Sequence, residues 1–155
     1  MLNKKICIGF NDLKSQDLDK KLFDKILKIS LENNVNTFDI ADNYYSGKLL
    51  VFFGNFIKKN QREKLYIINK FPLLRSKKEL EANLDKSLKL LNTEYIDVYM
   101  PHWPSFYFDA EKLANFAFKQ IKKGKIKKFG LSNFNLNLIK KFAKCYRNEI
   151  SIQTE

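Results

Sequence analysis

The sequence predicts an α/β fold in which helices pack against a sheet of parallel strands. Short apolar runs alternate with longer segments that repeat apolar residues at i, i+3, i+4 and i+7. The runs hold few charges, as strands covered by helices do, and they begin about every 30 residues, the length of one strand–helix unit. These observations favour right-handed crossovers between neighbouring parallel strands.

The expected strands are the apolar runs in chain order. They are KICIGF, NTFDIA, KLYIINK, YIDVYM, KKFGLS and ISIQ, at residues 5–10, 36–41, 64–70, 95–100, 127–132 and 150–153. Helices are expected in the periodic segments between them, at residues 17–33, 47–60, 76–92, 109–123 and 135–146. In the first helix, Leu18, Leu22, Ile26 and Ile29 form one apolar stripe, and mainly charged residues fill the other faces.

Length and composition indicate how many domains the chain forms and in which cellular compartment it is expected. With 155 residues, 45% of them hydrophobic, the chain is expected to form one globular domain spanning residues 1–155. The opening MLNKKICIGFND lacks the apolar core of a signal peptide, and no apolar run approaches the roughly 18 residues that span a bilayer. We therefore expect a cytoplasmic protein with no membrane contact.

The net charge of +12 is weak evidence for any partner, because the lysines spread over every expected helix. No helix gathers them with exposed aromatics, so no nucleic-acid binding is expected. A doubly wound nucleotide-binding sheet lacks its GxGxxG or GxxxxGK[ST] fingerprint. The two cysteines, Cys7 and Cys145, form no CxxC or Cys/His cluster, so they predict no metal site and are expected to be buried and reduced.

Polar side chains recur where the expected strands end. The carboxyl ends of parallel strands are where ligands bind in α/β sheets and barrels, so these groups are the candidates for a site. They are Asp39, Asp42, Tyr44, Lys70, His102, Ser132, Asn133 and Gln153.

Taken singly, most of these residues have a structural explanation. Asp39 or Asp42 could cap a helix or bind loop amides, and His102 could be a satisfied core imidazole. Ser132 and Asn133 could be helix N-caps, for which Asn135 is an equally good candidate. (Asn135 begins the expected fifth helix.)

Lys70 is different, because an ammonium group that ends an apolar run is rarely buried without a partner. A carboxylate on the neighbouring strand, Asp39, would supply one. Tyrosine is a poor acid at neutral pH, but a lysine beside Tyr44 would ease release of its proton, and His102 could orient a carbonyl oxygen. Together these residues fit proton transfer to a carbonyl.

The sequence resembles the aldo-keto reductases, (β/α)8 barrel enzymes that use NADPH or NADH. The resemblance rests on FDIADNYYSG with the later Gly54, IINKF, SLKLLNTEYIDVYMPHWP, GKIKKFGLSNFN and IQTE. These stretches occur in family order from about residue 6 to residue 155. The resemblance implies a partial (β/α)8 TIM barrel of about six parallel strands and five helices, in one domain that is incomplete at its C-terminus.

The resemblance also implies a role for each matching residue. Tyr44 would be the general acid, Lys70 would lower its pKa, Asp39 would pair with Lys70, and His102 would orient the substrate carbonyl. The nicotinamide carboxamide would contact Ser132, Asn133 and Gln153. Trp103 would line the substrate entrance, or else pack under a loop. An aldehyde or ketone would be reduced to an alcohol, with no metal involved.

Three departures from the family pattern carry expectations of their own. Tyr45 replaces a glycine after the catalytic tyrosine, which puts the shape of that turn in question, and Ile152 replaces an asparagine before Gln153. The seventh and eighth strands have no counterpart in these residues. An open barrel would expose an apolar interior and two sheet edges, so weak NADPH binding and self-association through those edges are expected. The alternative to an enzyme is a truncated remnant or an interaction module with an open edge.

Overall fold

The computed structural model describes residues 6–11 and 19–154 and confirms the α/β fold. One sheet of six parallel strands has the order β1-β2-β3-β4-β5-β6. The strands are β1 (Cys7–Gly9), β2 (Thr37–Ala41), β3 (Tyr66–Phe71), β4 (Ile96–Pro101), β5 (Ile126–Ser132) and β6 (Ile150–Gln153). Each expected strand is therefore present, and each lies within a residue or two of its expected position.

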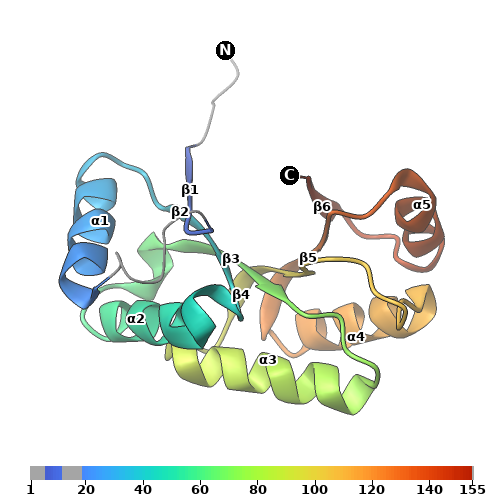
Figure 1. Ribbon diagram of the computed structural model, residues 1–155. Coiled ribbons are helices and arrows are strands. Elements are labelled where there is room, and N and C mark those ends of the chain that lie inside the picture. The colour runs from blue at the N-terminus through green and yellow to red at the C-terminus, as the bar shows by residue number, and fades with distance from the viewer. Residues whose placement is uncertain (1–5, 12–18, 155) are drawn as a thin grey trace.

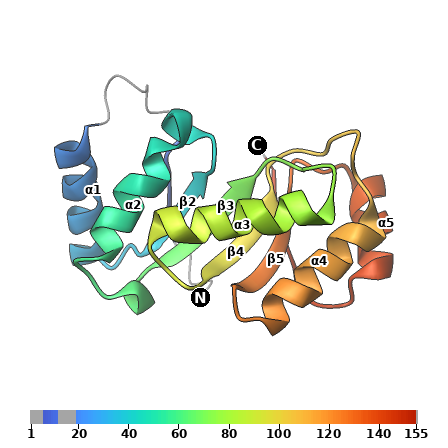
Figure 2. The same ribbon diagram turned by 90° about the horizontal axis from the view of Figure 1, so that it is seen from below.

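Five α-helices connect the strands and cover the outer face of the sheet (Figures 1 and 2). They are α1 (Lys20–Glu32), α2 (Lys48–Ile57), α3 (Lys77–Leu91), α4 (Ala110–Lys122) and α5 (Leu136–Cys145). The expected second helix, residues 47–60, is shorter in the structure, mainly because it ends at Ile57. A separate 3-10 turn, Tyr44–Gly47, precedes it. A second short turn, Arg62–Lys64, leads into β3.

The sheet curls into an open half-barrel, with the helices in an arc around its outside (Figure 1). One hydrogen bond shows how far the sheet is curled. In a flat sheet β2 and β6 would lie about 19 Å apart, four strand spacings. The Nε2 of Gln153 on β6 nevertheless donates to Oδ2 of Asp39 on β2 at 2.7 Å. The curl therefore brings the inner faces of distant strands together.

The main core lies between the sheet and the helices. Side chains alternate along a strand, so the inward Lys70 places its neighbours Asn69 and Phe71 on the outer face. The outer face of the sheet carries Phe38, Phe71 and Phe129, which belong to the same buried core as helix residues such as Phe23, Phe53, Phe116 and Phe142. This helix-covered core does not depend on a closed barrel.

The expectation of an apolar, water-exposed interior is wrong for β4, β5 and β6. The inner positions of β5 and β6 hold Lys128, Gly130, Ser132, Ser151 and Gln153, as the pairing of Gly130 with Ser151 and of Ser132 with Gln153 shows. The apolar residues facing inward from β4, Val98 and Met100, are both 2% exposed. On β3, by contrast, the inward Ile68, which pairs with Asp39, is partly exposed.

The expectation that both cysteines are buried is also wrong. Cys7 and Cys145 are both exposed. Cys7 lies on β1, an edge strand of the sheet, and Cys145 is the last residue of α5. At the edge of a sheet or at the end of a helix, a small side chain stays exposed because no neighbouring helix or strand covers it.

Gly54 sets how closely α2 packs on α3. A Cβ atom at this position would lie 2.1 Å from the backbone oxygen of Leu90. Backbone atoms cannot move aside as the end of a side chain can. The glycine is therefore required by the contact between the two helices.

We predict that Gly54→Ala destabilises the protein by about 3 kcal/mol, at the upper end of the cost of overpacking. Gly9→Ala is the matched control, because a Cβ at Gly9 would meet no atom within 4 Å. Denaturant unfolding monitored by circular dichroism measures both variants. Equal stability of the two would contradict the close packing described here.

Candidate active site

Lys70 and Asp39 form a buried ion pair inside the half-barrel. The Nζ of Lys70 on β3 contacts Oδ1 of Asp39 on β2, and only 2% of the Lys70 side chain is exposed. Burying an unpaired ammonium group costs several kcal/mol, so the carboxylate is what permits Lys70 to occupy this position. The partner expected from the sequence is the one observed.

Gln153 completes the contacts of Asp39. Its Nε2 donates to Oδ2 of Asp39, so the two carboxylate oxygens bind one group each from β3 and β6. The Oε1 of Gln153 is buried and has no hydrogen-bond partner among the described residues. A buried acceptor of this kind is ready to accept a hydrogen bond from a ligand.

Tyr44 and His102 lie beside this pair. Their ring centroids are 5.7 Å apart with the planes at 73°. The Nζ of Lys70 is 5.5 Å from the centroid of the Tyr44 ring. The structure thus brings Asp39, Tyr44, Lys70 and His102 together at the carboxyl ends of β2, β3 and β4.

Tyr44 begins a turn with unusual backbone conformation. Tyr45 (φ 52°), Ser46 (φ 56°) and Gly47 (φ 82°) are all left-handed, a region that costs most residues about 1 kcal/mol or more. The hydroxyl of Tyr45 donates to the backbone oxygen of Phe10 at 3.0 Å and ties the turn to the end of β1. The tyrosine that replaces the family's glycine therefore adopts the glycine-like conformation and adds an anchor.

Ser132 and Asn133 do not cap a helix. The N-cap of α5 is Asn135, whose side chain accepts from the backbone N of Leu138. Ser132 is 1% exposed, and Asn133 is left-handed with φ 62°. The Nδ2 of Asn133 lies 3.3 Å from Oγ of Ser132 and 3.2 Å from the backbone oxygen of His102.

The same three residues form a polar surface next to the ion pair. The backbone N of Asn133 donates to the backbone oxygen of Gln153 at 2.9 Å, which holds the ends of β5 and β6 together. Ser132 and Gln153 are directly paired in the sheet. A hydroxyl, a side-chain amide and an unpartnered amide oxygen could together hold a planar carboxamide. By contrast, Ile152 alternates to the outer face, so its replacement of an asparagine does not alter this surface.

Trp103 lies at a pocket of about 280 Å³ next to His102. The Trp103 and His102 rings stack at 6.1 Å and 30°, and 51% of Trp103 is exposed. The pocket is also lined by Asn43, Pro72, Leu73, Pro104 and Ser105, which come from loops that the sequence patterns did not single out. A side chain in an irregular loop gives no periodic signal, so these residues could not be predicted.

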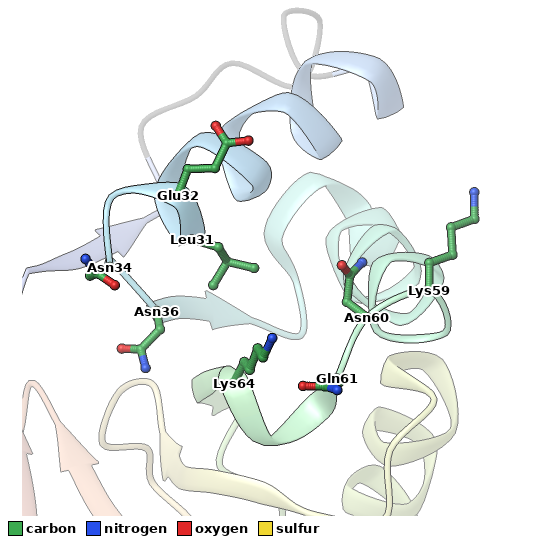
Figure 3. Close-up of a pocket in the computed structure, with 8 residues that line it drawn as sticks. All are labelled: Leu31, Glu32, Asn34, Asn36, Lys59, Asn60, Gln61 and Lys64. Carbon is green, nitrogen blue, oxygen red and sulfur yellow. The ribbon is translucent and has the colours of Figure 1, made fainter.

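A larger hollow lies at the other end of the sheet (Figure 3). Its volume is about 810 Å³, and its lining residues include Asn36 and Lys64, which precede β2 and β3. In Figure 3 the charged ends of Glu32 and Lys59 point outward on different sides. Because this hollow is at the amino ends of the strands and its charged groups do not converge, it is not the candidate site.

Two properties of the described residues bear on the kind of site. Within residues 6–11 and 19–154, no group of three or more histidine, cysteine, aspartate or glutamate side chains is arranged to hold a metal ion. In the same part of the chain, no helix combines the length and apolar composition needed to cross a membrane.

Comparison with known proteins agrees with the fold. The model of the Aldo/keto reductase family matches residues 5–153. The chain therefore belongs to the aldo/keto reductase family.

Curated relatives match most of this chain and less than half of their own length. Aldo-keto reductase YhdN of Bacillus subtilis (strain 168) is 28% identical over 134 residues, 80% of this chain and 40% of that protein. The NADH-specific methylglyoxal reductase of Escherichia coli (strain K12) is 29% identical over 160 aligned positions, 87% of this chain and 48% of that protein. Methylglyoxal reductase YeaE of the same strain is 29% identical over 110 residues, 70% of this chain and 38% of that protein.

Solved structures match the half-barrel. The thermostable aldo-keto reductase Tm1743, crystallised with the inhibitor epalrestat, has a TM-score of 0.81 and 27% identity, covering 88% of this chain and 50% of that one. A putative 2,5-diketo-D-gluconic acid reductase B has a TM-score of 0.80 at 21% identity, which supports the fold. The chain spans about half the length of these solved proteins.

We predict that Cys7 reacts slowly with alkylating reagents although it is exposed. Partial desolvation, with a smaller effect of the Asp39 carboxylate, raises the pKa of the Cys7 thiol from 9.0 to about 11. The thiolate is the reactive form, so at neutral pH its population falls by roughly 100-fold, and the rate should keep rising until about pH 11.

Peptide-resolved mass spectrometry after iodoacetamide treatment gives the rate at each pH. Cys7→Ser identifies the signal by removing it and leaves Cys145 as the remaining thiol. A Cys7 rate that levels off near pH 9 would contradict the effect of the Asp39 charge and of desolvation.

Proposed function

We propose that the protein is an NAD(P)H-dependent oxidoreductase that reduces a small aldehyde or ketone to an alcohol. One observation carries the proposal: the Nζ of a buried lysine, neutralised by Asp39, lies 5.5 Å from the centroid of the Tyr44 ring, and the centroid of the His102 ring lies 5.7 Å from the same point. This arrangement supplies a proton donor, a charge that favours its ionised form, and a group that can orient a carbonyl. Membership of the aldo/keto reductase family supports the same chemistry.

In this proposal Tyr44 gives its proton to the carbonyl oxygen. The ammonium group of Lys70 stabilises the phenolate that remains, because an opposite charge nearby favours the charged form. Asp39 keeps Lys70 in place and compensates its burial. A ring N–H of His102 donates to the carbonyl oxygen and so sets the direction from which Tyr44 reaches it.

The nicotinamide cofactor fits the residues at the ends of β5 and β6. Ser132, Asn133 and the unpartnered Oε1 of Gln153 would hold its carboxamide, and when bound it would supply the hydride. These side chains would orient the carboxamide, and Gln153 would link it to the Asp39 carboxylate through its own hydrogen bond. Whether NADPH or NADH is preferred depends on contacts to the rest of the cofactor.

The proposed substrate is a small carbonyl compound that enters beside Trp103. Both of the Escherichia coli relatives described above carry the name methylglyoxal reductase, which makes methylglyoxal a reasonable first test. The pocket next to His102 has about 280 Å³, the lower end of the range for small-molecule sites. Trp103 and Leu73 would contact the apolar part of the substrate.

A second candidate function is an interaction module that acts through an open sheet edge. Edge strands expose unpaired backbone groups, and on β6 the outward Ile152 is 47% exposed. On the neighbouring α5, Leu136 is 62% exposed. Self-association through this edge is the form of that proposal for these residues.

We predict that Tyr44→Phe lowers carbonyl reduction by about 100-fold or more, the contribution typical of a general acid. Loss of NADPH absorbance with methylglyoxal or another small aldehyde measures it. Tyr95→Phe is the control, because Tyr95 precedes β4 at the opposite end of the sheet. Turnover unchanged by Tyr44→Phe would remove Tyr44 as the acid. No turnover and no NADPH binding by the natural chain would favour the interaction module.

A further inference from the structure

A polar cluster lies behind the candidate active site, between the outer face of the sheet and α3. We call it the rear cluster. Asn69, Ser87 and Tyr99 are buried, and Asp42 and Asn83 are partly buried. Its members come from β3, α3, β4 and the segment that follows β2. None of them has been given a role in the proposed reaction.

Asp42 is the centre of the rear cluster. Its Oδ1 accepts from Nδ2 of Asn69 at 2.8 Å and from Oγ of Ser87 at 2.9 Å, and its Oδ2 accepts from Nδ2 of Asn83. The Nδ2 of Asn83 also lies 3.0 Å from the Tyr99 hydroxyl. One carboxylate therefore binds groups from a strand and from two turns of a helix.

Apart from α3, each element that the rear cluster joins carries or leads into a residue of the candidate site. Asn69 precedes Lys70 on β3, and its side chain points to the opposite face of the sheet. Asp42 lies two residues before Tyr44, and its backbone N donates to the backbone oxygen of Lys70 at 2.9 Å. The rear cluster thus fixes the start of the Tyr44 turn against the strand that carries Lys70.

The link to His102 runs through two aromatic residues. Tyr99 stacks on Phe71 with ring centroids 4.3 Å apart. The backbone oxygen of Phe71 accepts from the backbone N of His102 at 2.9 Å. The ends of β3 and β4 are therefore held in register by the same group of contacts.

A carboxylate is an unusual choice at this position. Burial raises the pKa of the Asp42 carboxyl, and hydrogen bonds from Asn69, Asn83 and Ser87 lower it. Removing the carboxylate would take away the acceptor of the Asn69 Nδ2, and a buried donor without an acceptor costs more than a lost neutral contact. Asn83 and Ser87 would keep only their weaker second acceptors, the Tyr99 hydroxyl and the backbone oxygen of Asn83. Apolar residues would be enough to pack α3 on the sheet. The polar arrangement therefore indicates that the elements it joins must be held in a defined relative position.

We propose that Asp42 is a positioning residue, which holds the Tyr44 turn and the Lys70 strand in the relative placement that the proposed reduction needs. This inference rests on the proposed function. Asp42 touches no reacting atom in this scheme and acts through Tyr44 and Lys70. Displacing a catalytic group by about 1 Å can cost 100-fold in rate, so a small shift of the turn is enough.

The test uses His102, the only histidine of the chain, as an internal probe. Its ring signals in NMR sense the Tyr44 ring at 5.7 Å. Tyr44→Leu first establishes how far those signals move when the contact is lost. We expect Asp42→Ala to move them in the same direction by at least half as much.

The matched control is Leu88→Ala on α3. Leu88 is 8% exposed and lies next to Ser87 in sequence, so its truncation destabilises the same helix without removing a member of the rear cluster. We expect the His102 signals of this variant to stay at their natural positions. If Asp42→Ala moves the signals no further than Leu88→Ala does, Asp42 is not a positioning residue.

Two variants cover the case in which Asp42→Ala does not fold. Ser87→Ala removes one donor and should produce a smaller shift in the same direction. Asp42→Asn should largely preserve the signals, because the Asn83 amide can turn over and accept from the new Nδ2 and from Tyr99. Natural signals in Ser87→Ala together with displaced signals in Asp42→Asn would overturn the proposal.

Measurements of turnover distinguish failure of this inference from failure of the proposed function. If the natural chain reduces carbonyls, Asp42→Ala should lower kcat by 10-fold to 100-fold with KM changed less than threefold, and an unchanged kcat would overturn the inference. If the natural chain shows no turnover at all, the proposed function fails. The His102 signals still decide, in that case, whether Asp42 positions Tyr44.

Discussion

The buried ion pair between Lys70 and Asp39 is the constraint on which the rest of the site depends. It joins β2 to β3 on the inner face, and Gln153 extends it to β6 across the half-barrel. An ammonium group at 2% exposure is tolerated only because a carboxylate meets it. The pair therefore fixes the curl of the sheet at its carboxyl ends and places a positive charge beside the Tyr44 ring.

The two faces of the sheet have different roles. The outer face stabilises the fold, and the inner face carries the candidate site. The outer face packs aromatic and aliphatic residues under five helices, and this packing does not involve the inner face. The inner face can therefore carry Asp39, Lys70, Ser132 and Gln153 at little cost to the core. Alternation along each strand makes this possible, since neighbouring residues such as Asn69 and Lys70 serve opposite faces.

Much of the fold and of the candidate site could be predicted from the sequence. There are physical reasons why the other features could not. Strand and helix order follow from periodicity, and Lys70 with Asp39 follows from the cost of burying a charge. The rear cluster could not be predicted, because Asn83 and Ser87 look like ordinary solvated positions of an amphipathic helix until α3 is placed over Asp42. Cys7 and Cys145 were expected to be buried from their residue type, whereas exposure depends on whether a neighbouring element covers them.

The most direct test of the account is a double-mutant cycle on the ion pair. Asp39→Leu leaves Lys70 buried without a partner and should cost about 3–5 kcal/mol in the free energy of unfolding. Adding Lys70→Met removes the uncompensated charge and should restore most of that loss, giving a coupling energy above about 2 kcal/mol. If denaturant unfolding instead shows that the two substitutions add independently, the pair does not organise this half-barrel.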